Sequence, residues 1–473
     1  MLVIRNATPV LRVRANNLQL TTTMNNTSKD HLVDLYLDNL DLITENSAEV
    51  LNHARQVGIE SFKLLGFPGP KSEKYKYTKV EQLFRSDYEK YFSPRKITFK
   101  VDDIFRCDIP SLDTHLALTL NGFYLGNPTS LHELPNGVVF GSLAEAAKKY
   151  PKLIQEHYNT VASTDDDGLV ALNTAFAQDG VFIYLPKGVV LERPIQIINL
   201  LMSDENQMVQ YRNLIIAEER SQANIVICDH TLSPAEFLTN VVTEVVTKAA
   251  SNVDVVVMQN QHNQSTQFSH LYARQERDSV FASNTISLHG GIIRNNIHVL
   301  LNDTNCENHT YGLALVDRNQ HVDTYSFIDH AQPNCVSNEL YKALLDDQAT
   351  GAFNGRILVR KDAQKTEAYQ SNNNLLLTAD ARMYTKPQLE IYADDVKCSH
   401  GATIGQLDQE ARFYMQARGI SEREARLLLM FGFAHDVVGK IKIEPLRERI
   451  DELVNKRLRG ELSRCHSCPM HCC

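Results

Sequence analysis

The spacing of hydrophobic residues divides the chain into a helical beginning, a long strand-rich centre and a helical end. Over residues 30–92, apolar side chains recur at three- and four-residue steps, which predicts helices. Residues 66–70, with two Gly and two Pro, interrupt this pattern, and the charged segment 71–78 is predicted to be a solvated face. Residues 96–165 are mixed, with one helix predicted at 142–149.

Strand-like runs rich in Val and Ile fill the centre, and almost no stretch between Gly180 and Gly401 has a helical period. Every second run starts 28 to 30 residues further on, at Phe182, Ile195, Arg212, Ala223, Asn240 and Asn252, and a similar spacing continues at His270, Ile293, Val322 and Phe353. This spacing favours a parallel β-helix, in which each coil buries its face against its neighbours. A pair of β-sandwiches, with turns about every 8–12 residues, stays an alternative because no residue-level repeat is visible.

Helical spacing returns after Asp408. Residues 409–418 predict a helix that ends at Gly419, and Ser421 with Glu424 forms a capping box that opens a second one. A third helix is predicted from Pro445, with its apolar side chains on one face. These apolar faces either pack on the chain itself or offer a surface to a partner.

Composition narrows the function classes. The net charge of −9 over 473 residues provides no basic field, so we expect neither nucleic acid nor a membrane as a partner. Five of the nine cysteines are scattered and four fall within the last nine residues, which fits a reducing compartment such as the cytoplasm. Residues 1–23 are Arg-containing and lack acidic residues, so they are either a disordered leader, an over-extended start, or a transit peptide to an organelle.

Two groups of residues are candidates for metal chemistry. Cys398 and His400 follow an alternating strand near a predicted Gly-containing corner, on one face and roughly 6–7 Å apart. They are either ligands for iron or zinc, or a small buried thiol beside a hydrogen-bonded histidine. The tail places Cys465, Cys468, His471 and Cys472 at spacings suited to Zn²⁺ or an Fe–S centre, but it lacks a second Cys-x-x-Cys and otherwise serves as a flexible, reducible end.

The segment Tyr-Ala-Asp-Asp-Val-Lys-Cys-Ser-His-Gly-Ala-Thr at 392–403 resembles the SufD signature within the SufB/SufD family of iron–sulfur cluster assembly proteins. Residues 171–188, 288–295, 322–330 and 413–420 resemble other family segments, and the resemblance covers about residues 30–455. It implies a mainly β fold, a right-handed parallel β-helix core flanked by N-terminal and C-terminal α-helical domains. It also implies a scaffold subunit and not an enzyme.

The resemblance further implies partners: the paralogue SufB, the ATPase SufC and, indirectly, sulfur-delivery proteins. The C-terminal helices would bind SufC, and the candidate contacts are Phe413, Arg418, Leu429 and Phe433. ATP hydrolysis is expected in that partner because the chain has no Walker A motif. A transient iron or Fe–S cluster is expected at the SufB interface, where His400 matches the family residue with Cys398 beside it. No cofactor is expected to bind tightly to this chain by itself. A flavin bound elsewhere in the complex stays an alternative, but it cannot be assigned to any residue of this chain.

Residue differences favour SufD over SufB. SufB proteins carry Cys in a Gln-Cys-Asp-Ser-Leu-Leu segment, whereas residues 370–376 contain no thiol, and the corner after Cys398 lacks the SufB carboxylates. A cluster needs thiolate or sulfide ligands, and their scarcity here fits a half-site at Cys398 and His400 that is completed across an interface. A homodimer facing itself across the same seam stays open, as does a polysaccharide-binding β-helix that would use Asp323, Asp329 and Lys342.

Pattern and resemblance together predict five segments. These are a leader at 1–23, an N-terminal helical or mixed domain at 24–165, a β-helix core at 166–405, an ATPase-binding helical domain at 406–460 and a Cys/His-rich tail at 461–473. Tyr75 stands where the family usually has Trp, which keeps an aromatic ring.

Overall fold

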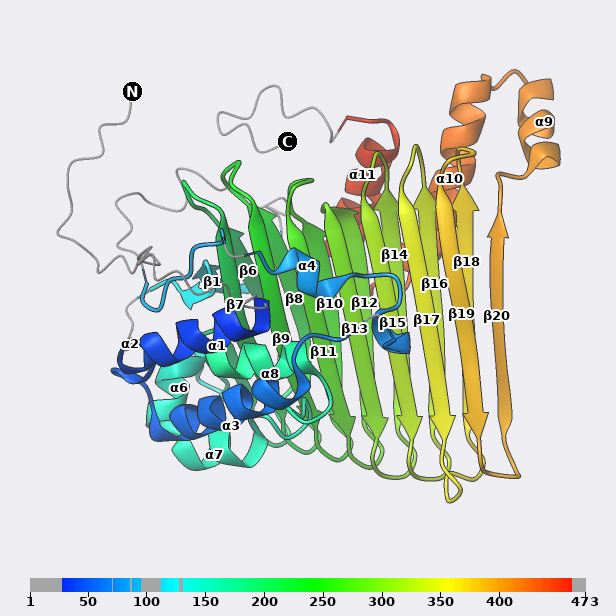
Figure 1. The fold of residues 1–473 in the computed structure, drawn as a ribbon. Helices are drawn as coiled ribbons and strands as arrows, with labels where there is room; N and C mark the ends of the chain where they lie inside the picture. The colour runs from blue at the N-terminus through cyan, green and yellow to red at the C-terminus, as the bar shows by residue number, and fades with distance from the viewer. Residues whose placement is uncertain (1–27, 70, 86, 95–111, 127–130, 462–473) are drawn as a thin grey trace.

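A computed structural model shows a flattened parallel β-helix with helices on its two broad faces (Figure 1). It describes residues 28–69, 71–85, 87–94, 112–126 and 131–461. The predicted leader at 1–23 and the tail cysteines therefore lie outside the described residues. From β5 (Val181–Leu185) onward, the chain winds so that successive strands alternate between two ten-stranded sheets.

One sheet, called here the even sheet after most of its labels, has the order β2 (Phe123–Tyr124), β1 (His115–Leu120), β6 (Ile195–Leu201), β8 (Gln222–Thr231), β10 (Asn252–Asn260), β12 (Val280–His289), β14 (Glu307–Val316), β16 (Val336–Leu345), β18 (Glu367–Leu376) and β20 (Lys397–Gly405). The other, called the odd sheet, has the order β19 (Arg382–Ile391), β17 (Thr350–Val359), β15 (His321–His330), β13 (Ile292–Leu301), β11 (Thr266–Gln275), β9 (Phe237–Thr247), β7 (Gln207–Ala217), β5 (Val181–Leu185), β4 (Val139–Ser142) and β3 (Leu131–Glu133).

The strand register explains the spacing seen in the sequence. Gln222 pairs with Asn252 and Asn252 with Val280, so the chain advances 30 and then 28 residues per coil. From β5 to β20, neighbouring strands in both sheets are parallel, which confirms the β-helix and makes the β-sandwich alternative wrong. Strand β6 begins at the predicted Ile195, whereas β7 begins at Gln207, five residues before the predicted Arg212. Residues 180–401, all of them described, contain no helix, as predicted.

Each central coil turns one corner in the same way. The backbone is left-handed, with φ between 57° and 60°, at Arg220, Ala250, Asp278, Asn305, Asn334 and Lys365. The next residue in each coil is buried, and these residues form what we call the corner column: Ser221, Ser251, Ser279, Cys306, Cys335 and Thr366. Small polar or thiol side chains stack at this corner because only they fit beside the turn and still reach a backbone carbonyl.

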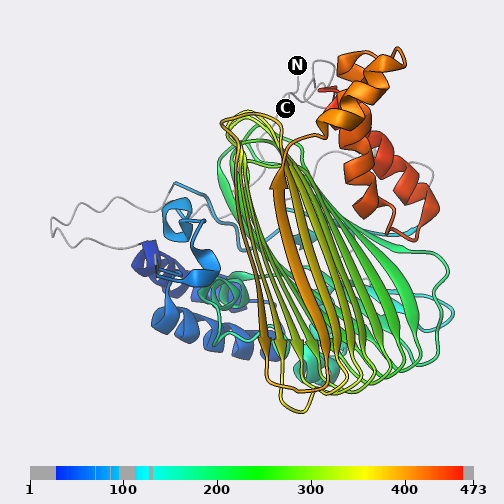
Figure 2. The same cartoon turned by 90° about the vertical axis from the view of Figure 1, so that its right-hand side faces the viewer.

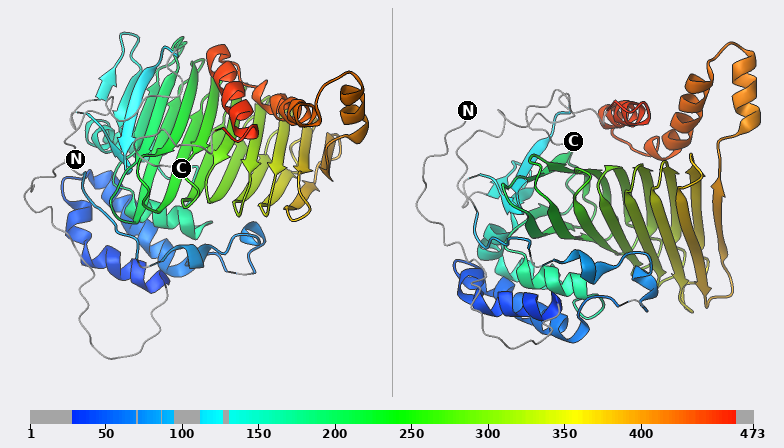
Figure 3. Two further views of the ribbon diagram at one scale, coloured as in Figure 1. Left: turned by 90° about the horizontal axis from the view of Figure 1, so that it is seen from above. Right: turned by 45° about the horizontal axis from the view of Figure 1, so that its top comes forward.

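The helices cover the two sheets from opposite sides (Figure 2). N-terminal helices pack on the odd sheet in a cluster that includes Phe62, Phe176 and Phe268: α1 (Ser28–Asp38), α2 (Leu40–Thr44), α3 (Glu49–Leu65), η1 (Glu73–Tyr75), α4 (Val80–Leu83) and α8 (Gly168–Phe176). Helices α6 (Leu143–Lys149) and α7 (Pro151–His157) pack on the same sheet in a second cluster, with Phe182 and Leu214. C-terminal helices α10 (Glu422–Val438) and α11 (Glu444–Leu458) pack on the even sheet, while α9 (Gln409–Ala417) has no buried residue and stands at the far end (Figure 3).

The predicted helix boundaries hold closely at both ends. Ser142 caps α6 and Ser421 caps α10, each accepting the backbone N–H three residues on. The sheets, however, begin before the predicted boundary at residue 166, since β1 pairs with β6 and β4 pairs with β5. Among the residues that the structure describes, no helix is long and apolar enough to cross a membrane.

Candidate functional site at the open end of the β-helix

The two ends of the β-helix differ, and the end formed by β19 and β20 is called here the open end. At the beginning, β2 and β3 are only two and three residues long, and both pair antiparallel. At the other end, β19 and β20 have ten and nine residues, and each terminates its sheet with one edge unpaired. The last coil therefore presents long rows of backbone N–H and C=O groups that no other strand meets (Figure 2).

Cys398 and His400 lie on the same face of β20, as their spacing predicted. Cys398 pairs in register with Ala368 and contacts the interior core, so this face continues the inside of the β-helix. The predicted corner is wrong: Gly401 lies within the strand opposite Ser371, and the chain turns earlier, after β19. His400 is exposed because no further coil covers it.

A buried polar row runs inward from His400. Glu339, Gln370 and His400 occupy the same register position in β16, β18 and β20. The Gln370 side-chain amide donates to a Glu339 carboxyl oxygen at 2.9 Å, and the Ser326 hydroxyl donates to the other oxygen. Burial raises the pKa of Glu339 to about 7. The Gln370 side-chain oxygen, next in line beneath His400, is buried and has no hydrogen-bond partner.

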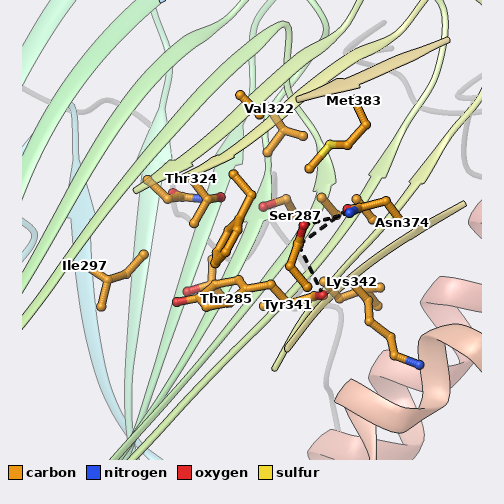
Figure 4. Close-up of a pocket in the computed structure, with 17 residues that line it drawn as sticks. Thr285, Ser287, Ile297, Val322, Thr324, Tyr341, Lys342, Asn374 and Met383 are labelled. Carbon is orange, nitrogen blue, oxygen red and sulfur yellow. Dashed lines mark hydrogen bonds between the residues drawn. The ribbon is translucent and has the colours of Figure 1, made fainter. Parts of the chain in front are cut away.

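Asn372 lies in the segment 370–376, which contains no thiol. Its side chain is 2% exposed and accepts a hydrogen bond from the Thr385 hydroxyl at 2.8 Å, so it bridges the two sheets. Beside it lies an internal cavity of about 30 Å³, which is room for one water molecule. Figure 4 shows Tyr341, Asn374 and Met383 around this cavity, with the Lys342 amine pointing away from it toward a helix.

Cys398 and His400 are potential metal ligands at the open end, and no third one lies near them in the described part of the chain. Within the described ranges, no three His, Cys, Asp or Glu side chains lie close enough together to hold a metal ion. Burial raises the pKa of the Cys398 thiol, so it stays protonated at neutral pH unless a bound metal displaces the proton. Cys398 and His400 are two potential ligands, which is fewer than a structural or catalytic metal site needs.

The four candidate residues of the C-terminal helices fall into two pairs. Phe413 is 72% exposed on α9, and Arg418, which ends that helix, lies 4.4 Å over the ring of Tyr414. Leu429 and Phe433 are half-buried and pack into the cluster between α10 and the even sheet. The apolar faces of α10 and α11 thus pack on the chain itself, whereas α9 is free.

Buried polar contacts hold the N-terminal segment 74–78 to the odd sheet, and these contacts, called here the latch, were not revealed by the sequence. Arg294 pairs with Asp323 at 2.6 Å, both almost fully buried, and also donates to the Lys74 carbonyl. The Tyr75 hydroxyl donates to Asp167 at 2.7 Å, and Thr78 donates to Asp323 at 2.6 Å. Segment 71–78 was predicted to be solvated, which is wrong for Tyr75 and Thr78, each of which is 4% exposed.

Comparisons with known proteins agree with this architecture. Residues 200–433 match the family model described as "SUF system FeS cluster assembly, SufBD core domain", and residues 26–197 match "SufBD protein N-terminal region". The chain belongs to the SufBD family. This confirms the resemblance seen in the sequence and gives the chain a role in iron–sulfur cluster assembly.

Relatives match the SufBD-family chain over most of its length. An iron–sulfur cluster assembly SufBD family protein of Synechocystis is 28% identical, covering 88% of this chain and 92% of the relative. The iron–sulfur cluster assembly protein SufD of Escherichia coli is 27% identical, covering 88% and 94%. A chloroplastic protein of Arabidopsis thaliana, ABCI7, is 27% identical, covering 85% of each chain.

Proposed function

We propose that the chain is the SufD-like subunit of a complex with a SufB paralogue and the ATPase SufC. The observation that carries the proposal is the open end of the β-helix, where two long strand edges lie unpaired beside Cys398 and His400. Unpaired edges of this length are normally covered, because they recruit other strands. A paralogous β-helix end placed against β20 would satisfy these groups and bring further ligands to His400.

Exposed apolar side chains at the same end support an interface. Ile391, Tyr392 and Ile404 are 39%, 64% and 46% exposed on or next to the last two strands. Apolar side chains gathered beside an unpaired edge mark a surface that a protein partner covers. The same edges would also fit a second copy of this chain, which is the homodimer alternative.

In this proposal the iron or nascent Fe–S cluster is cargo and not a resident cofactor. His400 and Cys398 contribute two ligands, and the paralogue contributes thiolates in place of the one absent at Asn372. Sulfur reaches the seam through sulfur-delivery proteins. The chain acts as a scaffold and not as an enzyme, and a flavin is assigned to no residue.

The C-terminal helices are the proposed link to the ATPase. Exposed Phe413 and Arg418 are suited to contact it directly, while Leu429 and Phe433 hold α10 against the even sheet. Movement of α9 and α10 on ATP binding would reach β14 and β16, which α10 contacts, and from there the open end. ATP hydrolysis would thus be coupled to opening and closing of the seam.

The three residues that a polysaccharide-binding protein would use are all engaged in ion pairs within the chain. Asp323 is paired with buried Arg294, Asp329 with Arg360, and Lys342 with Asp436 on α10. These charges stabilise the fold and are not free to bind a glycan. We place the complex in the cytoplasm, or in an organelle if residues 1–23 form a transit peptide, and we propose no nucleic acid or membrane as a partner.

Co-purification tests the proposal. The tagged chain, co-expressed with SufB-like and SufC-like proteins of the same genome, should retain both, as shown by native mass spectrometry. Ile404→Lys should release the paralogue but not the ATPase, because the charge lies at the open end. Val190→Lys, which alters an apolar residue 57% exposed elsewhere, is the matched control and should retain both. Recovery of a stable homodimer that excludes the paralogue would contradict the proposal.

A further inference from the structure

Cys335 departs from the turn geometry of the corner column. At four other positions the side chain donates to the carbonyl oxygen three residues earlier, at 2.7 Å for Ser221, 2.8 Å for Ser251, 3.1 Å for Cys306 and 2.9 Å for Thr366. No such bond within its own turn is seen for Cys335; its sulfur lies 3.2 Å from the Asp303 carbonyl oxygen in the preceding coil, as the Cys306 sulfur lies 3.3 Å from that of Glu276. The Asp303 oxygen also lies 3.1 Å from the Cys306 sulfur, so two thiols from neighbouring coils converge on a single atom.

The backbone sets the two cysteines at the separation of a disulfide. The Val336 N–H donates to the Cys306 carbonyl at 2.9 Å, and Glu307 pairs with Val336, so Cys306 lies directly beside Cys335. Neighbouring parallel strands are about 5 Å apart, which falls within the Cα separation of about 4.4–6.8 Å that disulfides require. Both side chains belong to the same interior cluster and therefore point the same way.

A buried histidine accompanies the pair. His330 is fully buried, its Nε2 lies 2.8 Å from the Ser337 hydroxyl, and its Nδ1 has no hydrogen-bond partner. The interactions with the Cys306 thiol and with His330 lower the pKa of Cys335 to about 5, while the pairing raises the pKa of Cys306. One sulfur is therefore poised to ionise and the other to keep its proton, which is the asymmetry that oxidation of a dithiol uses.

We propose that Cys306 and Cys335 form a reversible dithiol–disulfide site, oxidised by hydrogen peroxide, that joins two neighbouring coils. The Cys335 thiolate attacks one peroxide oxygen, the O–O bond breaks, and the departing hydroxide takes up a proton to leave as water. The Cys306 sulfur then attacks the resulting sulfenic sulfur, the S–O bond breaks, and the Cys306 proton leaves with the hydroxyl as a second water. One peroxide is thus reduced to two waters while two thiols are oxidised.

The site is independent of the cluster-assembly end. Asn305 and Asn334, which precede the two cysteines, are exposed, so a small neutral oxidant has only the turn to cross. The disulfide would fix two coils of the scaffold to each other without touching β20.

Peptide mapping of the native full-length chain tests this inference. After peroxide treatment and alkylation in denaturant, trypsin releases Cys306 in residues 295–318 and Cys335 in residues 319–342. We expect the two peptides to be joined, and dithiothreitol to separate them again. Cys228, on β8 and away from both, should be recovered alkylated in the same digest.

Serine variants of the two cysteines test which sulfur attacks the peroxide first. These variants should fold, because Ser already occupies equivalent positions of the corner column. Cys306→Ser should leave Cys335 as a sulfenic or sulfinic acid, whereas Cys335→Ser should leave Cys306 as a thiol at the same peroxide dose. Two alkylated thiols in the wild-type protein, a link to another cysteine, or a link that forms only after unfolding would each overturn the inference.

Discussion

Replacing Glu339 by Gln should remove a pH dependence from the stability of the β-helix. The Glu339 side chain lies inside the last coils, where the Gln370 amide and the Ser326 hydroxyl are its partners. Burial raises the pKa of this carboxyl from an ordinary 4.5 to about 7. Glutamine has the same shape, can accept from Gln370 and donate to Ser326, and does not titrate.

The sign and size of the change in unfolding free energy with pH follow from proton linkage. Between pH 4.5 and about 7 the folded chain keeps a proton that the unfolded chain has released. The stability that this protonated group provides is complete below pH 4.5 and is lost as the pH rises through about 7. Each pH unit in this interval lowers the free energy of unfolding by about 1.4 kcal/mol, which amounts to about 3 kcal/mol across it.

Urea titrations from pH 4.5 to 7.5 on wild type and Glu339→Gln measure the effect. The difference in unfolding free energy, wild type minus variant, should fall by about 3 kcal/mol over this range. Glu367→Gln, which alters a partly exposed glutamate paired with Lys397 on the last strands, is the control and should show little slope. A difference for Glu339→Gln that stays within about 0.5 kcal/mol at every pH would refute the reasoning, because the carboxyl would then titrate as it does in water.

Two further predictions concern the latch and the C-terminal helices. Asp323→Asn leaves Arg294 buried without its charge partner and should lower stability by about 3–5 kcal/mol in urea titrations, whereas a double change to apolar residues should lose less. An equal loss of stability in the single and the double variant would contradict the explanation that the unpaired buried charge of Arg294 causes the loss. Phe413→Ala should alter stability by less than about 0.5 kcal/mol yet weaken ATPase retention in a pull-down, while Phe433→Ala should cost about 2 kcal/mol. Unchanged retention with Phe413→Ala would remove α9 from the proposed interface.

The β-helix could be predicted from the sequence because parallel coils in register repeat their strand starts at a nearly constant interval. The corner column could not be predicted, because the feature that repeats there is a backbone angle and not a residue type. Arg220, Ala250 and Asp278 have little in common except their left-handed φ. The predicted strand starts also omitted β12, β14, β16 and β18. The inward positions near the beginnings of β14 and β16 carry polar residues such as Asn308 and Glu339 in place of Val or Ile.

The candidate site was predictable in part. The period of two in a strand placed Cys398 and His400 on one face, and the structure agrees, but the glycine after them was mistaken for a corner. The buried row beneath His400 lies in three strands about 30 residues apart, so no local pattern connects its members. For the same reason Tyr75, remote in sequence from Arg294 and Asp323, could not be assigned to the latch.

The most direct test of the account is the iron and sulfide content of the reconstituted complex with and without His400. We predict that His400→Ala leaves the fold and complex formation intact and reduces bound iron and sulfide to background. Ser399→Ala, on the opposite face of the same strand, should behave as wild type. Wild-type iron and sulfide in the His400→Ala complex would contradict the claim that the open end of the β-helix is where the cluster is assembled.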